Sequence, residues 1–202
     1  MTAARHSKRK VVICISGMAG CGKSTVAKKI AKQYKLRYLS GGDALKALAL
    51  KAGYKTLDRG WWESEEGIKF LRERAHDRSF DKKVDEKLLE WAKEGNVVLD
   101  SWTMPWLLKG GFKIWLEASP QERAKRIARR DRISVKKAFA ALTEKDTKTR
   151  AIYKELYGFD LGQDVSPFDL VLDVNQISQA EVFQALRLIV DRLLFRDNYD
   201  AH

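Results

Sequence analysis

The sequence predicts an α/β fold in which five strands form a parallel sheet. Short runs of β-branched and apolar residues alternate along the chain with segments of helical periodicity, which is typical of strands joined by helices. Helix-start signatures stand at the joints between them. Hydrophobic residues make up 45% of the 202 residues, enough for the core of one domain of ordinary size. We expect strands at residues 11–16, 36–39, 96–100, 112–117 and 169–174.

Helices are expected after the first, fourth and fifth strands. Residues 24–34 carry apolar side chains at helical spacing, namely Val26, Ala27, Ile30 and Ala31. Ser119-Pro120-Gln121-Glu122 combines an N-cap serine, a proline in the first turn and a capping-box glutamate. Ser178-Gln179-Ala180-Glu181 repeats the serine-to-glutamate spacing before a C-terminal helix that we expect to end near residue 195.

Two stretches interrupt the regular alternation of strands and helices. Residues 44 to 94 are mostly polar with helical patterning, and residues 133 to 162 are basic and helical. We expect both to be insertions at the edge of the sheet's ligand face. The chain is therefore interpreted as one domain over residues 1–202, with its core in residues 10–43, 95–125 and 165–196.

The chain is basic, with a net charge of +12, and the charge is unevenly distributed. Between Arg123 and Arg150, eleven Lys or Arg residues stand against three acidic residues. Such a segment is either a solvated helical face or a surface that attracts polyanions, whether nucleotide phosphates or nucleic acid. The charge alone does not decide between these readings.

The cysteine pattern and the hydropathy of the chain bear on its cellular compartment. Cys14 and Cys21 match no metal-site or disulfide pattern, which indicates reduced thiols. No run of about 18 apolar residues is present to span a membrane. The basic residues 1–10 pass directly into the first strand and do not resemble a signal peptide. We expect a cytoplasmic protein that is a monomer or a weak homo-oligomer and does not associate with membranes.

One glycine-rich segment matches every fixed position of the phosphate-binding pattern G-x-x-x-x-G-K-[ST]. It is Gly17-Met18-Ala19-Gly20-Cys21-Gly22-Lys23-Ser24, followed by Thr25. The segment follows a predicted strand and opens a predicted helix, which is the context expected of a P-loop. Its backbone N–H groups and the helix N-terminus would hold phosphate oxygens. Lys23 would reach the β- and γ-phosphates, and the Ser24 hydroxyl would bind Mg²⁺.

Two further segments lie at the ends of predicted strands. Asp100 ends the third strand, where a carboxylate can hold Mg²⁺ through water or orient an acceptor, or can be an ordinary turn residue. Ser40-Gly41-Gly42-Asp43 follows the second strand. A turn of small residues lets a ligand approach the backbone, although it can equally be a plain strand-to-helix loop capped by Asp43.

Arginines gather in the basic segment, at Arg123, Arg126, Arg129, Arg130 and Arg132. Arg126, Arg129 and Arg130 share one helical face. Because arginine neutralises charge on a transferring phosphoryl group, we expect at least two of the set to contact phosphate. Arg150 is a candidate to join them. We expect Arg123 to be solvated surface.

Trp61 and Trp62 are adjacent in a polar stretch. Neighbouring side chains of a helix point in different directions, so we expect one to be core and the other to make a surface contact. The alternative is a stacking platform for a base.

Several of these segments, taken together, resemble a known family. Beyond the P-loop, the matching segments are Tyr38-Leu39-Ser40-Gly41-Gly42-Asp43, Ile114-Trp115-Leu116, Arg126-Ile127-Ala128 with Arg130-Asp131, and Tyr153-Lys154-Glu155-Leu156-Tyr157-Gly158-Phe159-Asp160 with Asp169-Leu170-Val171. The segment that begins at Tyr153 is the most specific, because generic P-loop proteins lack it. Over nearly its whole length the chain resembles the nucleoside monophosphate kinases, and specifically the short archaeal-type cytidylate kinases.

The resemblance implies a three-layer α/β/α P-loop fold with strand order 2-3-1-4-5. It implies a helical acceptor-binding insertion at about residues 44–94 and a basic lid at about 126–162. The implied activity is phosphoryl transfer from ATP to CMP or dCMP with Mg²⁺, in a site that closes to exclude water. The implied catalytic residues are Lys23, Arg126, Arg130 and Arg150. Ser24 and Asp100 would bind the metal, and the acceptor would contact Ser40, Gly41, Asp43, Lys46, Asp100 and Trp102.

Two departures from the family pattern fall on the acceptor side. The family usually has a Gly-Arg pair after the third strand, where this chain has Ser101-Trp102, and Lys46 replaces a usual arginine. A lysine is a point charge and not a bidentate fork, so the exchange changes the chemistry. Arg59 and Arg72 are candidates to supply the missing contacts.

Two alternative functions stay open for this reason. One is a P-loop kinase with a different small acceptor, either another nucleotide or a metabolite. The other is an NTPase that associates with nucleic acid through the basic segment, for which we expect strongly salt-dependent binding.

Overall fold

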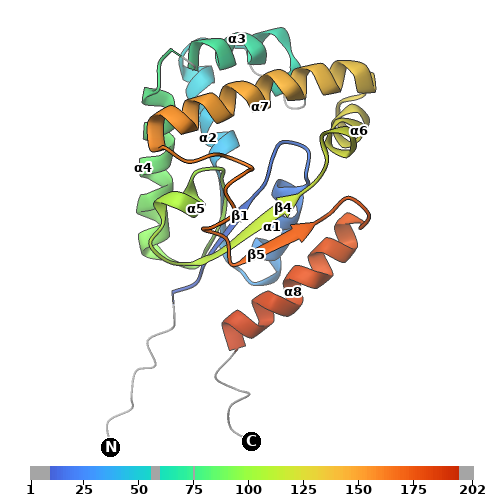
Figure 1. Ribbon diagram of the computed structural model, residues 1–202. Helices are drawn as coiled ribbons and strands as arrows, with labels where there is room; N and C mark the ends of the chain where they lie inside the picture. The colour runs from blue at the N-terminus through green and yellow to red at the C-terminus, as the bar shows by residue number, and fades with distance from the viewer. Residues whose placement is uncertain (1–9, 56–59, 75, 196–202) are drawn as a thin grey trace, which may run out of the picture.

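The computed structural model describes residues 10–55, 60–74 and 76–195. Its centre is a five-stranded sheet in the order β2-β3-β1-β4-β5, with every neighbouring pair parallel (Figure 1). The expected strand order is therefore confirmed, and each strand boundary lies within one residue of its expected place. The strands are β1 (Val12–Ser16), β2 (Arg37–Ser40), β3 (Val97–Asp100), β4 (Phe112–Glu117) and β5 (Leu170–Asp173).

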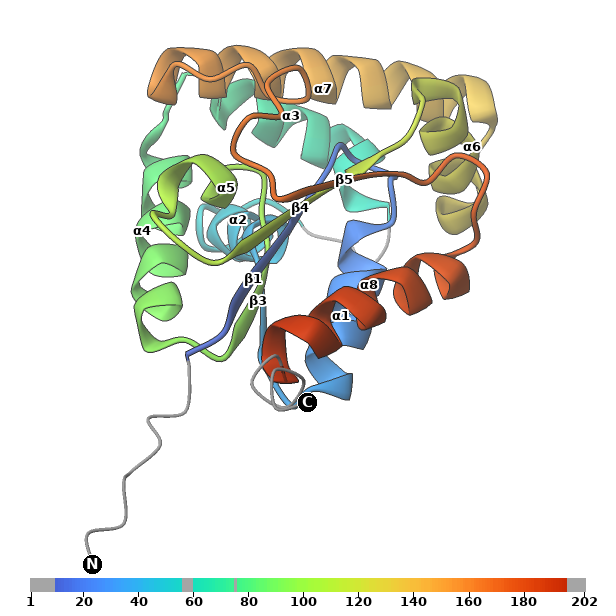
Figure 2. The ribbon, with the colours of Figure 1, turned by 60° about the horizontal axis from the view of Figure 1, so that its bottom comes forward.

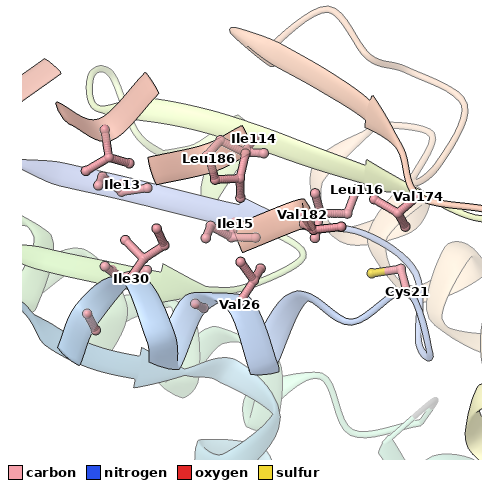
Figure 3. Packing of buried hydrophobic residues seen from close by; sticks show 14 of the residues in the cluster. Ile13, Ile15, Cys21, Val26, Ile30, Ile114, Leu116, Val174, Val182 and Leu186 are labelled. Carbon is pink, nitrogen blue, oxygen red and sulfur yellow. The ribbon is translucent and has the colours of Figure 1, made fainter. Parts of the chain in front are cut away.

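Helices cover both faces of the sheet (Figures 1 and 2). Helices α1 (Lys23–Gln33) and α8 (Gln179–Phe195) pack on one face. Helices α2 (Gly41–Lys51), α4 (Ser79–Glu94) and the short α5 (Met104–Leu107) pack on the other. The central strand β1 alternates between these layers. Ile13 and Ile15 face α1 and α8 (Figure 3), while Cys14 belongs to the cluster on the α4 side. A strand buried on both faces explains the continuous apolar run in the sequence.

A further layer lies across the carboxyl ends of the strands. The long helix α7 (Val135–Tyr157) runs beside α3 (Glu65–Arg74), and α6 (Pro120–Asp131) packs against it (Figures 1 and 2). Ala124, Ile127 and Ala128 of α6 contact Ala138 and Leu142 of α7 in a small core of their own. The 3₁₀ turn η1 (Trp61–Glu63) precedes α3. This layer places charged side chains of α3 and α7 opposite the carboxyl ends of the strands.

The helix-start signatures have the expected geometry. The Ser119 hydroxyl accepts a hydrogen bond from the Glu122 N–H at 3.3 Å. At the start of α8, the Ser178 hydroxyl accepts from the Glu181 N–H at 3.3 Å, and the Glu181 carboxylate accepts from the Ser178 N–H at 2.6 Å. Both bonds of a capping box are thus present in α8, and each satisfies a backbone donor that the helix leaves unpaired.

Cys14 and Cys21 are buried free thiols. Within the part of the chain that the structure describes, none of the helices combines the length and the apolar character needed to cross a lipid bilayer.

Candidate active site

A cavity of about 440 Å³ opens at the carboxyl ends of β1, β2 and β3. This is the position at which open parallel sheets bind their ligands, and the volume lies in the range of small-molecule sites. Its walls come from the P-loop, the start of α2, η1, α4, the segment after β3, α6 and α7. Among the predicted site residues, it is lined by Ala19, Gly20, Gly22, Lys23, Ser24, Thr25, Ser40, Gly41, Asp43, Lys46, Asp100, Trp102, Arg126 and Arg130.

The P-loop forms one end of the cavity. Gly22 has a φ of 100° and is the N-cap of α1, whose first residues Lys23, Ser24 and Thr25 line the cavity. The first-turn N–H groups of a helix have no partner within the helix, so they are available to an anion. Gly20 has a φ of +85°, and a Cβ there would lie 2.8 Å from the Arg123 carbonyl oxygen. The loop therefore needs glycine at this position for both conformation and space.

Three residues of the glycine-rich segment support the loop from behind. Gly17, Met18 and Cys21 are absent from the cavity lining. Met18 and Cys21 are each 3% exposed and belong to core clusters. The carbonyl of Gly17 accepts a hydrogen bond from the Trp102 indole.

The arginines of the basic segment have different positions. Arg126 and Arg130 line the cavity. The Arg126 guanidinium is fixed by the carbonyls of Cys21, at 3.2 Å, and Val174, at 2.5 Å. Arg150 lies outside the lining and donates to the Leu161 carbonyl at 3.1 Å.

The expectation that Arg123 is solvated surface is wrong. Its side chain is 3% exposed and makes an ion pair with Asp146 of α7 at 2.8 Å. It also donates to the carbonyls of Ala118, at 3.2 Å, and Ala19, at 3.1 Å. Because Asp146 neutralises the charge and the carbonyls occupy its other donors, the guanidinium can be buried between α6, α7 and the P-loop.

The acceptor-side turn and Asp100 lie together at the ends of β2 and β3. The Ser40 hydroxyl caps α2 by accepting from the Asp43 N–H at 3.1 Å. In the sheet register Asp100 stands between Ser40 of β2 and Ile15 of β1, and it is 3% exposed. The Tyr38 hydroxyl donates to the Asp100 carboxylate at 3.0 Å. Burial and this carboxylate raise the pKa of Tyr38, so the tyrosine remains a donor.

The oxygen donors here suit Mg²⁺. The Ser24 hydroxyl and the Asp100 carboxylate both line the cavity. Mg²⁺ usually binds through one or two carboxylates, waters and substrate phosphates, and a dedicated protein cage is unusual. No group of three or more His, Cys, Asp or Glu side chains in residues 10–55, 60–74 and 76–195 is arranged to hold a metal. An ion at this position would therefore take its other ligands from phosphates and water.

The far wall contains a buried charged network that the sequence analysis missed. Arg74 of α3 is 0% exposed and Asp81 of α4 is 2% exposed, and they form two hydrogen bonds of 2.8 and 2.6 Å. Arg74 also donates to the Tyr153 hydroxyl of α7 at 2.8 Å. All three residues line the cavity. The network therefore joins α3, α4 and α7 around the ligand space.

Asp85 lies one helical turn beyond Asp81 and also lines the cavity. It accepts hydrogen bonds from the Thr103 hydroxyl and, at 2.7 Å, from the Tyr157 hydroxyl. Burial raises the pKa of Asp85 to about 6, although both hydrogen bonds act in the opposite direction. The sequence signal was available, because Asp81 and Asp85 share the face of α4 that buries Val84, Leu88 and Ala92. Two carboxylates in an apolar stripe indicate a site.

One tryptophan of the pair is a core residue, as expected, and the stacking platform for a base stays a prediction. Trp61 is 2% exposed and packs with Phe70, which confirms that one of the two is core. Trp62 is partly buried, and both side chains line the cavity. Trp102, after β3, also lines it. Trp62 and Trp102 are thus the two indoles of the lining that are not buried in the core.

Of the two candidates for the missing arginine contacts, the structure describes Arg72, which does not line this cavity. Arg72 has a 66% exposed side chain that pairs with Glu144 at 3.5 Å, outside the lining. Arg59 lies outside the described residues.

Solved structures with a similar fold are known. The structure resembles a shikimate kinase from Bacteroides thetaiotaomicron with a TM-score of 0.54 and 15% identity, over 91% of this chain and 98% of that chain. It also resembles a gluconokinase from Sinorhizobium meliloti with a TM-score of 0.51 and 15% identity, over 96% and 98% of the two chains. At this identity the likeness describes the fold alone. Fold and phosphate-binding segment together define a P-loop α/β protein.

The chain belongs to the cytidylate kinase-like family, whose model matches residues 12–176. It is 36% identical over 187 residues to the cytidylate kinase of Pyrococcus horikoshii, covering 92% of this chain and 91% of that protein. It is 32% identical over 188 residues to the cytidylate kinase of Methanocaldococcus jannaschii, covering 91% and 99% of the two chains. The resemblance expected from the motifs is confirmed, and the protein is a kinase.

Proposed function

We propose that the protein transfers the γ-phosphoryl group of ATP, in the presence of Mg²⁺, to the phosphate of CMP or dCMP. The products are ADP and the pyrimidine nucleoside diphosphate. The observation that carries this proposal is that one cavity combines the P-loop residues Lys23 and Ser24 with a buried charged and aromatic wall. The relatives named cytidylate kinase support the choice of a cytidine nucleotide as acceptor.

The proposed binding of the ATP phosphates rests on the positions of the positively charged side chains. Phosphoryl transfer asks the protein mainly to position the reactants and to neutralise charge on the transferring group. Lys23 enters the cavity from α1, and Arg126 and Arg130 enter from α6. Arg126 is held by two backbone carbonyls, so its guanidinium is pre-organised. Arg150 lies outside the cavity lining and is held by the Leu161 carbonyl.

Ser24 and Asp100 are the residues that we assign to Mg²⁺. When bound, the ion would offset negative charge on the nucleotide phosphates. Asp100 is held in place by Tyr38 and by its position at the end of a central strand. A phosphate acceptor is already a nucleophile, so the site needs no general base.

The wall formed by Arg74, Asp81 and Asp85 suits the edge of a cytosine base. Cytosine presents an amino group that donates and a ring nitrogen and carbonyl that accept. The carboxylates can accept from the amino group. The Nη1 atom of Arg74 is buried and has no hydrogen-bond partner within the described residues, so it is available to donate. Uracil presents a carbonyl where cytosine presents the amino group, which places an acceptor against the carboxylates.

A panel of acceptors tests the proposal. ATP consumption is measured in a coupled assay with CMP, dCMP, UMP, AMP, GMP and dTMP supplied separately. We expect strong turnover with CMP or dCMP and a loss of at least about 100-fold in Lys23→Ala, since a pre-organised charge is removed. Lys32→Ala, on the exposed face of the same helix, is the matched control and should retain activity. If ATP binds but no monophosphate stimulates turnover, the acceptor is a different molecule.

A further inference from the structure

Lys145 is a buried lysine that has no role in the proposed function described so far. It is 7% exposed and belongs to the buried stripe of α7, together with Leu142, Asp146 and Thr149. Lysine is among the residues that are least often buried to this extent. Lys145 also lines the cavity, at the part of α7 that faces the P-loop and η1. A positive charge is therefore held inside the ligand space.

Two indole rings define the position of this charge. The Lys145 ammonium lies 4.3 Å from the centroid of the Trp62 ring and 5.7 Å from that of the Trp102 ring. Both distances are within the range of cation–π attraction. Trp62 comes from η1 and Trp102 from the segment after β3, so two separate elements restrict one flexible side chain. The lysine is placed by its surroundings, as a binding residue must be.

Trp102 also connects this lysine to the P-loop. Its indole N–H donates to the Gly17 carbonyl at 2.7 Å, which fixes the ring relative to the loop. The Lys23 ammonium lies 5.3 Å from the centroid of the same ring. Two ammonium groups thus share one indole, at the boundary between the P-loop and the α7 side of the cavity.

We propose that Lys145 binds the phosphate of the acceptor monophosphate and that Trp102 is a positioning residue that sets this lysine opposite Lys23. The inference rests on the proposed function and names the residues that hold the acceptor phosphate. A lysine ammonium is a compact charge with three rotatable donors, so it can follow phosphate oxygens without planar alignment. The assignment gives Trp102 a role through its contacts with Lys145 and Gly17.

Binding of CMP and of cytidine, which lacks the phosphate, tests this assignment. Dissociation constants for both are measured by calorimetry in the wild type, Lys145→Met, Lys145→Arg and Trp102→Phe. We expect Lys145→Met to lower the preference for CMP over cytidine by about 10- to 100-fold, the value of a hydrogen bond to a charged group. Cytidine affinity should stay within about twofold. Lys145→Arg should keep most of the preference, and Trp102→Phe should lose part of it, because the bond to Gly17 is removed.

Lys136→Met is the matched control, because Lys136 is an exposed lysine near the start of the same helix. Its CMP preference should equal that of the wild type. If Lys145→Met does not fold, Lys145→Gln replaces it, since glutamine keeps a polar side chain. An unchanged CMP preference in a folded Lys145 variant overturns the assignment. A wild type that binds CMP no better than cytidine overturns the proposed function as well, so the two failures are distinguishable.

Discussion

Removing the Asp81 carboxylate should destabilise the protein far more than removing an exposed carboxylate. Arg74 and Asp81 are 0% and 2% exposed and are joined by two hydrogen bonds of 2.8 and 2.6 Å. In Asp81→Ala the guanidinium stays buried without its counter-charge. Breaking such a pair costs about 3–5 kcal/mol. For a chain of this length, 1 kcal/mol corresponds to about 2–4 °C, so the Tm should fall by about 6–20 °C.

Urea and thermal unfolding measure this effect, with Glu90→Ala as the matched control. Glu90 pairs with Lys87 on the exposed face of the same helix, with side chains that are 56% and 61% exposed, so its loss should cost about 0–1 kcal/mol. The double variant Arg74→Met/Asp81→Leu should recover most of the lost stability, because neither member of the pair is left buried without the other. If Asp81→Ala unfolds like Glu90→Ala, the reasoning about the buried network is refuted.

Two further substitutions test the P-loop and the charged wall. Gly20→Ala should destabilise the protein by about 1–3 kcal/mol in urea, since φ is +85° and its Cβ would lie 2.8 Å from the Arg123 carbonyl; Gly110→Ala, where a Cβ meets nothing within 4 Å, should be nearly neutral. Burial raises the pKa of Asp85 to about 6 beside Asp81 and Arg74, from about 3.9 in the unfolded chain. The stability contributed by its protonated form is therefore present below about pH 4 and is lost as the pH rises through about 6. As the pH rises from about 4 to above 6, the free energy of unfolding of Asp85→Asn should increase by about 2–3 kcal/mol relative to that of the wild type. A difference between the two proteins that does not change with pH would contradict the assigned pKa.

The strands and the phosphate-binding loop could be predicted because their signals are local. β1 is one apolar run, and the P-loop has a fixed spacing of Gly17, Gly22 and Lys23 between a strand and a helix. The capping serines Ser119 and Ser178 act on residues three positions away. Each of these features depends only on neighbours in the sequence.

The residues whose positions could not be predicted are placed by contacts between segments that are distant in the sequence. Arg123 is buried because Asp146 faces it from another helix, and Lys145 is buried because α7 crosses the cavity beside two tryptophans. In the sequence both residues look like ordinary members of a basic run. Arg74 becomes part of the site only through Asp81 and Tyr153, which lie on two other helices.

The same contacts bear on the nucleic-acid alternative. Arg123 and Arg126 bind protein groups of the P-loop region, Arg150 binds the Leu161 carbonyl, and Lys148 pairs with Glu144. Lys145 faces the cavity. Arg123 and Lys145 are buried and Arg126 and Lys148 are half-buried, whereas the other seven basic residues of this segment are exposed. A cavity lined by lysine and arginine favours nucleotide phosphates as its polyanion.

The destination of the γ-phosphoryl group tests the central claim most directly. ATP labelled in its γ-phosphate is incubated with CMP, Mg²⁺ and the full-length protein, and the labelled products are separated. A kinase that binds both nucleotides in this cavity and excludes water should place the label in CDP, with little inorganic phosphate. Label that appears in inorganic phosphate at the same rate with and without CMP would contradict phosphoryl transfer to the acceptor.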